Sequence, residues 1–219
     1  MKNNILSYQE FLENETYYGE KVRGHALSTD QKLKKYLNYS NGVYIESGAS
    51  AGIAGSNTKI FEDFFGWTGL LIEPCVEGYD LCLKNRPNSI SVHAALVSND
   101  FKDDEVYGDF AGSPSAYCSV GGWKWKKMMK NDPYLLSREM TNVPATTITS
   151  ILENNNITDV DFWSLDTEGY ELEALKGLDF SKWQPKYILV ELLKFSDHPK
   201  TQWNVKDPSE CNFEEVKSY

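Results

Sequence analysis

The segment at residues 43–58, VYIESGASAGIAGSNT, combines an acidic side chain with closely spaced glycines. An apolar and aromatic run, which suits a buried parallel strand, leads to Glu46, and Gly48 and Gly52 follow it. Glycine lets the backbone bend sharply and lets a ligand lie directly against it. A strand, a glycine turn and a helix N-terminus form the ligand-facing crevice of doubly wound α/β folds. We therefore expect a ligand here, and the candidate binding residues are Glu46, Gly48, Ala49, Ser50, Gly52, Asn57 and Thr58.

The spacing of the glycines argues against a dinucleotide-binding loop. That fingerprint would place glycines at positions 48, 50 and 53, but the chain has Ser50 and Ile53. The remaining pattern, an acidic residue, x, Gly, x, x, x, Gly, resembles the first motif of class I S-adenosylmethionine (SAM) methyltransferases. In that family the turn wraps the methionine end of the cofactor, and no pyrophosphate has to be neutralised. A structural glycine turn in some other α/β protein is the alternative.

A second acidic residue follows at the spacing of a βαβ unit. The strand GLLIEP ends on Glu73, about 25 residues after Gly48. A carboxylate at that strand end can accept hydrogen bonds from both ribose hydroxyls. In the next strand, SISVHAALV, the small residues Ala94 and Ala95 leave room for a flat adenine. Glu73 and Ala95 therefore join the candidate cofactor-binding residues, with a surface glutamate before a proline as the alternative for Glu73.

The segment DFWSLDTEGYELEALKGLDF repeats the order of strand, acidic turn and helix. Asp166 ends its strand, where doubly wound folds place ligands, and it is the first candidate for a general base acting on a hydroxyl. Glu168 would hold the acceptor or share a cation with Asp166. His198, which follows a fifth strand, is the rival base. The alternatives are a helix cap or a cofactor ligand for Asp166, a charge favoured by the helix dipole for Glu168, and a surface residue for His198.

A metal site is the less favoured interpretation of the same acidic residues. Asp166, Glu168 and Glu191 offer hard oxygen ligands of the kind that Mg²⁺ prefers. No spacing in the sequence requires a cation, so we expect SAM and not a resident metal.

Residues 113–143 show no clean periodicity, and long irregular connections in compact domains are often functional. Trp123, Lys124 and Trp125 stand together after two glycines. Aromatic faces stack on sugar rings, and a lysine can meet hydroxyl or phosphate groups. We therefore expect this insertion to cover the acceptor, with a helix that buries its tryptophans as the alternative.

The elements that must position these residues indicate an α/β protein. We expect a Rossmann-like class I methyltransferase fold, with a mostly parallel twisted sheet and helices on both faces. The expected domains are an N-terminal helical segment at 1–40, a SAM-binding methyltransferase domain at 41–199 and an acidic tail at 200–219. Helices are expected at 29–37, 57–65, 77–85 and 144–155, and an extra edge strand at 105–110.

Taken together, these segments resemble the FkbM-type family of SAM-dependent O-methyltransferases. The matching pieces are YIESGASAGIAGSNT, GWTGLLIEP, LKNRPNSISVHAALVS, DFWSLDTEGYELEALKGLDF and PKYILVE, which cover residues 42–191 in the right order. The resemblance implies methylation of a hydroxyl on a sugar, such as a deoxyhexose like rhamnose, in a glycan or nucleotide sugar. The chain is also similar to methyltransferase domains of large-DNA-virus glycan enzymes, which implies fusion to glycosyltransferase domains in a longer protein. At 47–50 the chain has SGAS, where the family commonly carries Asp or Asn.

Composition excludes several classes of partner. The net charge of −10 is poorly suited to a polyanion, so we expect no nucleic-acid substrate. No segment approaches 18 consecutive apolar residues, so we expect no membrane span, and the N-terminus does not resemble a signal peptide. The four cysteines show no metal-binding spacing, which predicts reduced thiols and a cytoplasmic location. A free-standing enzyme and an excised domain are equally compatible with these features.

Three other function classes stay open. An NAD-type oxidoreductase or epimerase would share the strand order, but the chain lacks the central glycine, and Tyr134, Tyr170 and Tyr187 are not followed four residues later by the lysine of a Tyr-x-x-x-Lys pair. An RNA ribose methyltransferase is disfavoured by the charge. A binding module without catalytic activity is the last alternative.

Overall fold

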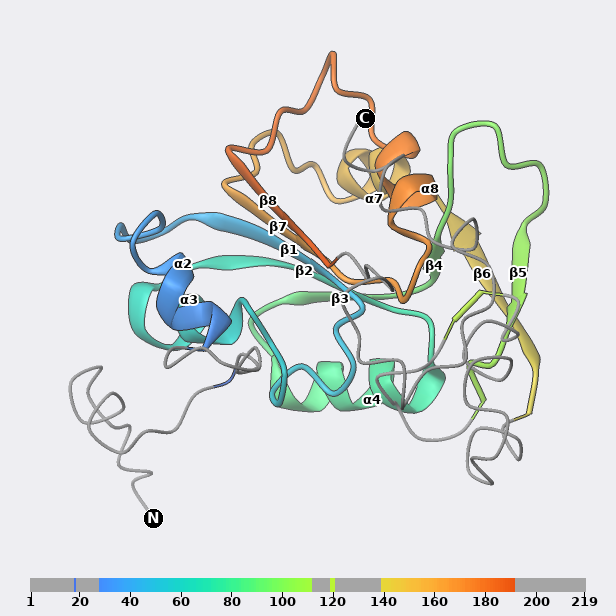
Figure 1. The fold of residues 1–219 in the computed structure, drawn as a ribbon, viewed down its shortest axis with the longest axis horizontal. Helices are drawn as coiled ribbons and strands as arrows, with labels where there is room; N and C mark the ends of the chain where they lie inside the picture. Colours follow the sequence, from blue (N-terminus) through green and yellow to red (C-terminus); the bar gives the residue numbers. More distant parts are fainter. Residues whose placement is uncertain (1–17, 19–27, 112–118, 121–138, 192–219) are drawn as a thin grey trace, which may run out of the picture.

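The computed structural model describes Tyr18 and residues 28–111, 119–120 and 139–191. Its centre is a parallel sheet in the order β3-β2-β1-β7-β8. The strands are β1 (Val43–Ser47), β2 (Thr68–Glu73), β3 (Ile90–His93), β7 (Phe162–Leu165) and β8 (Tyr187–Val190). The chain moves outward from β1 to β3 and then returns to the other side of β1 (Figure 1). The strand order therefore reverses between β1 and β7, which is where doubly wound folds bind ligands.

Helices cover both faces of this sheet, as the sequence predicts. On one face Tyr44 packs with Ile60 and Phe61 of α3 (Lys59–Phe65), on the same side as α4 (Val76–Asn85). On the other face Ile45 packs with α7 (Ile148–Asn154) and α8 (Glu171–Lys176) (Figure 1). Because successive strand residues point to opposite faces, neighbouring apolar residues of one strand supply two cores. The chain therefore has the Rossmann-like α/β fold.

A small second sheet lies beside the central one, in the order β4-β6-β5. It contains β4 (Ala95–Leu96), β5 (Glu105–Gly108) and β6 (Thr141–Thr146). The prediction of an edge strand at 105–110 is confirmed by β5. The prediction of one strand through 89–97 is wrong, because the chain changes sheets at Ala94: β3 pairs with β2, whereas β4 pairs with β6.

The helix predicted at 144–155 begins later than expected. Pro144 belongs to β6 and lies opposite Glu105 in the antiparallel ladder. The cap of α7 is Thr147, one of the two threonines that the sequence offers for this role, and its hydroxyl accepts a hydrogen bond from the Ser150 backbone N–H at 3.1 Å. A side-chain acceptor at this position satisfies one of the free N–H groups of the first turn.

The helix predicted at 29–37 is shorter in the structure. It is α2 (Thr29–Leu33), and its N-cap is Ser28. The Ser28 backbone N–H donates to Gln31 Oε1 at 2.8 Å, which is one half of a capping box. Most of the expected N-terminal segment and all of the acidic tail fall outside the described residues. None of the described helices is long and apolar enough to cross a membrane.

Candidate active site

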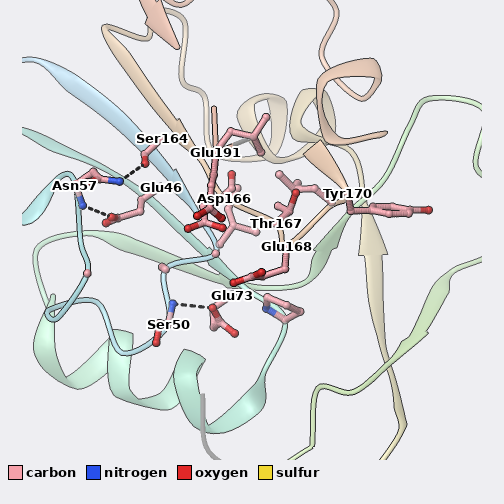
Figure 2. Close-up of a pocket in the computed structure, with 18 of the residues that line it drawn as sticks. Glu46, Ser50, Asn57, Glu73, Ser164, Asp166, Thr167, Glu168, Tyr170 and Glu191 are labelled. Atoms are coloured by element: carbon pink, nitrogen blue, oxygen red, sulfur yellow. Dashed lines mark hydrogen bonds between the residues drawn. The ribbon is translucent and has the colours of Figure 1, made fainter. Parts of the chain in front are cut away.

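A cavity of about 500 Å³ opens at the carboxyl ends of the central strands (Figure 2). Cavities of this size hold small organic ligands. The lining includes most of the predicted site residues: Glu46, Gly48, Ala49, Ser50, Asn57, Glu73, Ala95, Asp166 and Glu168. The fold therefore brings the first acidic turn, the end of β2 and the second acidic turn around one space.

Gly48 is fixed by the approach of two strand ends. Its φ is 76°, in the left-handed region, and a Cβ atom there would lie 1.8 Å from the Asp166 carbonyl oxygen. Its backbone N–H donates to the Ile72 carbonyl at 2.9 Å. A side chain at position 48 would push β1 and β7 apart. The glycine thus lets the first turn pack directly against the residue expected to act as base.

Glu73 ends β2 with its carboxylate on the cavity lining. Its Oε2 accepts the Ser50 backbone N–H at 2.7 Å (Figure 2). Its Oε1 accepts the Cys75 N–H at 2.9 Å. Ser50 has a φ of 51°, so the hydrogen bond to Glu73 supports a backbone conformation that non-glycine residues rarely adopt. Each carboxylate oxygen has two acceptor directions, so Glu73 can hold this turn and still accept from a ligand hydroxyl.

Glu46 faces its own loop as well as the cavity. Its Oε2 accepts the hydroxyls of Ser56 at 2.8 Å and Thr58 at 2.6 Å, and its Oε1 accepts the Asn57 backbone N–H at 2.7 Å. The Asn57 side chain in turn donates to Ser164 Oγ at 3.0 Å on β7 (Figure 2). The structure thus gives Glu46 a role in shaping the loop between β1 and α3.

Two residues predicted to bind the cofactor lie off the cavity lining. Thr58 is fully buried, and its hydroxyl donates to Glu46. Gly52 packs against α4, where a Cβ atom would lie 3.1 Å from Arg86 Cγ. The remaining predicted residues, His198, Trp123, Lys124 and Trp125, lie outside the described residues, and their assignments stay predictions.

Three carboxyl groups meet at the ends of β7 and β8. Asp166, Glu168 and Glu191 each offer an oxygen, and these oxygens all lie within 4.8 Å of one another (Figure 2). Burial raises the pKa of the Asp166 carboxyl well above its usual range. The negative charge of Glu191 and its hydrogen bond with Asp166 raise this pKa further, and so does the negative charge of Glu168. Asp166 Oδ1 is buried and has no hydrogen-bond partner among the described residues. Asp166 itself lines the cavity, so its ionised carboxylate is a candidate proton acceptor.

The turn that carries Asp166 and Glu168 is held by Glu171. Its Oε1 accepts the backbone N–H groups of Thr167 at 3.0 Å and Gly169 at 2.9 Å. This support matters because Glu168 and Gly169 both have positive φ, 55° and 98°. Glu171 is only 2% exposed, so its carboxylate accepts hydrogen bonds from this turn and not from solvent.

A family model described as the methyltransferase FkbM domain matches residues 46–213. The chain belongs to the FkbM methyltransferase family. No curated protein and no solved structure matched the chain. The matched range begins at Glu46 and contains Glu73, Asp166, Glu168 and Glu191, so every described acid on the cavity lining lies within the family domain.

Sequence reasoning had named Glu191 of this FkbM-family methyltransferase only as a possible metal ligand. Its position at the carboxyl end of β8, the same signal that identified Asp166, could have placed it in the site. Phe110 and Val120 also line the cavity, from the side of the second sheet. No local pattern marks those two residues, because they reach the cavity only through the pairing of distant segments.

The same acidic cluster could accommodate a cation in this FkbM-family enzyme. Three hard oxygen donors within one small volume suit Mg²⁺. None of the described lining residues is a lysine or arginine that would neutralise the cluster. The carboxylates of the cluster repel one another. A proton on Asp166, which its raised pKa favours, relieves this repulsion without a metal.

Proposed function

We propose that this methyltransferase uses SAM to methylate a sugar hydroxyl, in a glycan or a nucleotide sugar. The observation that carries the proposal is the shared cavity: the glycine turn and Glu73 line the same space as the Asp166 cluster. A cofactor held at the first set of residues would lie beside a proton acceptor at the second. The FkbM family membership supports this assignment, and the acceptor class rests on the resemblance of the sequence motifs.

The residues present fit SAM. Glu73 lies on the cavity lining, and a carboxylate is the acceptor that ribose hydroxyls would need. Ala94 and Ala95 line the cavity, and their small apolar side chains leave room for an adenine ring. The glycine turn from β1 to α3 presents backbone and small side chains, against which an amino-acid chain can lie closely.

In the proposed reaction the protein orients the acceptor and takes its proton. Bound SAM supplies a methyl group on a positively charged sulfur. The methyl–oxygen bond would form as the methyl–sulfur bond breaks and S-adenosylhomocysteine leaves as a neutral thioether, while Asp166 would accept the proton of the sugar hydroxyl and Glu168 would hold the acceptor. Because a sugar hydroxyl is a weak nucleophile, a base within hydrogen-bond reach contributes about 10²–10⁴ in rate. Alignment of the reacting groups contributes several kcal/mol more.

The cofactor assignment is tested by calorimetric titration with SAM, with its demethylated product S-adenosylhomocysteine, and with NAD. We expect both SAM compounds to bind and NAD not to bind. Glu73→Ala should weaken SAM binding by about 1–3 kcal/mol, the cost typical of losing hydrogen bonds to a buried charged partner. Glu77→Ala is the matched control, because Glu77 is exposed on α4 and lies off the cavity lining. Binding of NAD without binding of SAM would favour the oxidoreductase alternative and contradict the proposal.

A further inference from the structure

One face of α4 contacts the outer side of the glycine turn. Cys82 and Asn85 of this helix and Arg86, its C-cap residue, donate to three consecutive backbone carbonyls of the turn: Cys82 to Ser50 at 3.3 Å, Asn85 to Ala51 at 2.8 Å and Arg86 to Gly52 at 3.0 Å. Cys82 and Asn85 share a helix face because they are three residues apart. These three hydrogen bonds thus fix the orientation of the backbone carbonyls of the turn, and they do so from outside the cavity.

Arg86 extends this contact to three further elements. Its Nε donates to Glu62 of α3 at 2.7 Å, and its Nη2 donates to the Tyr44 hydroxyl of β1 at 2.7 Å. The same guanidinium reaches Ser56 Oγ at 3.3 Å and Thr58 Oγ1 at 3.2 Å, in the loop that Glu46 also holds. A planar guanidinium with five N–H donors can serve several acceptors at once, and a lysine cannot reproduce that geometry.

This arginine is buried and charged. Its side chain is 0% exposed, and it lies off the cavity lining. Burial acts to lower the pKa of Arg86, but the neighbouring Tyr44, Glu46 and Glu62 raise it above its usual value, so the guanidinium stays charged. A buried charge with this many partners holds its neighbours in one arrangement, because any other arrangement would leave charged groups unpaired.

We propose that Arg86, assisted by Asn85, is a positioning residue that holds the 50–58 loop in its ligand-binding conformation. The inner side of that loop, at Ser50, Ala54, Gly55 and Asn57, lines the cavity. Ser50 has a left-handed φ of 51°, a conformation that the chain keeps only if its surroundings impose it. If the loop adopted other conformations, the apparent affinity would fall in proportion to the fraction of molecules unable to bind. A loop held in this one conformation avoids that loss. This inference rests on the proposed function, because it names SAM as the ligand of the loop.

The test compares the Arg86→Lys and Asn85→Ala variants of the full chain by three readouts. These are the dissociation constant for S-adenosylhomocysteine, the thermal unfolding midpoint, and hydrogen–deuterium exchange of the 50–58 amides. We expect Arg86→Lys to weaken binding roughly 10- to 100-fold and Asn85→Ala roughly 3- to 10-fold, in line with the loss of charged and neutral hydrogen bonds. Exchange at 50–58 should be faster in both variants, and the KM for the acceptor should stay near its wild-type value.

The matched control for a purely structural effect is Asp161→Asn. Asp161 is also buried and ionic: it accepts the Val43 backbone N–H at 2.8 Å and the Tyr39 hydroxyl at 2.9 Å, and it pairs with Lys186. It lies at the start of β1 and β7, the opposite end of the sheet from the cavity. We expect this variant to lower the unfolding midpoint without changing affinity for S-adenosylhomocysteine.

The outcomes separate the inference from the proposed function. A folded Arg86→Lys variant with wild-type affinity and wild-type exchange at 50–58 would overturn the inference. If Arg86→Lys does not fold, Asn85→Ala decides, since weaker binding with faster exchange supports the inference and unchanged values overturn it. If the wild-type protein binds neither SAM nor its product, the proposed function fails, and with it the naming of SAM as the ligand of this loop.

Discussion

At the scale of single residues, the site depends on a carboxyl group kept in an unfavourable place. Asp166 is surrounded by other acids, and its Oδ1 has no partner among the residues that the structure describes. An ordinary aspartate, with a pKa near 4, is a weak base. Burial first, and the Glu191 charge second, raise the pKa of Asp166 and so strengthen it as a proton acceptor.

The pH dependence of the reaction follows from this arrangement. Asp166 must be ionised to accept a proton, so kcat/KM should rise with pH through its raised pKa and then level off. Glu191→Gln removes a neighbouring negative charge and lowers the pKa of Asp166, so the rising limb should move to lower pH. Glu153→Gln, at an exposed ion pair on α7, should leave the profile unchanged. An identical profile in Glu191→Gln and wild type would show that the two carboxyl groups are not coupled in the reaction.

Position alone points to Asp166 and Glu73 in the sequence, since each ends a parallel strand at the ligand-binding edge, and both line the cavity. It could not foresee that Glu46 would accept three hydrogen bonds from its own loop. Arg86 gave no signal either, since an arginine at a helix end before a proline is typical of a helix stop. Its role depends on acceptors from three other elements, which only the folded chain brings together.

At the scale of elements, the close approach of β1 to β7 explains why the first turn needs glycine. Gly48 and Gly55 both have positive φ, 76° and 82°, so alanine is strained at either position. The two glycines differ in the room available for a side chain. A Cβ atom at Gly48 would lie 1.8 Å from the Asp166 carbonyl oxygen, whereas a Cβ atom at Gly55 would have no heavy atom within 4 Å.

We therefore expect Gly48→Ala to lower the free energy of unfolding by about 1–3 kcal/mol more than Gly55→Ala, the usual cost of overpacking. Chemical denaturation of the two variants measures the difference directly. Because the backbone strain is common to both variants, the additional loss of unfolding free energy in Gly48→Ala measures the effect of the contact between β1 and β7. Equal losses would mean that the strand ends separate easily and do not constrain position 48.

The strands of the central sheet were predictable because each is a short apolar run bounded by turn residues. The change of sheet at Ala94 was not, since the apolar pattern of SISVHAALV continues through it. The partner of β4 is β6, which lies more than 40 residues further along the chain. Pro144 also suits the first turn of a helix, but pairing of Val143 with Val106 places it in a strand. In both cases a distant partner overrode the local preference.

At the scale of the whole molecule, the strand reversal between β1 and β7 brings the proposed cofactor-binding residues and the proposed base around one opening. The order β3-β2-β1-β7-β8 brings the end of β2 from one side and the ends of β7 and β8 from the other. This arrangement makes a two-substrate reaction possible within a single cavity, and the central claim is that the reaction is methyl transfer.

The measurement that tests this claim most directly is SAM-dependent methyl transfer to a panel of nucleotide sugars and deoxyhexose-bearing oligosaccharides, read by mass, with wild type and Asp166→Asn side by side. We expect wild type to add one methyl group to a sugar in the panel, in the presence of EDTA as well as without it. Asp166→Asn should be slower by about 10²–10⁴, with affinity for S-adenosylhomocysteine retained. Loss of that affinity would make Asp166 a cofactor ligand, and loss of activity in EDTA with recovery in Mg²⁺ would assign the carboxylates to a metal. Near-normal turnover by Asp166→Asn, or no transfer to any sugar by a wild-type protein that binds SAM, would contradict the account.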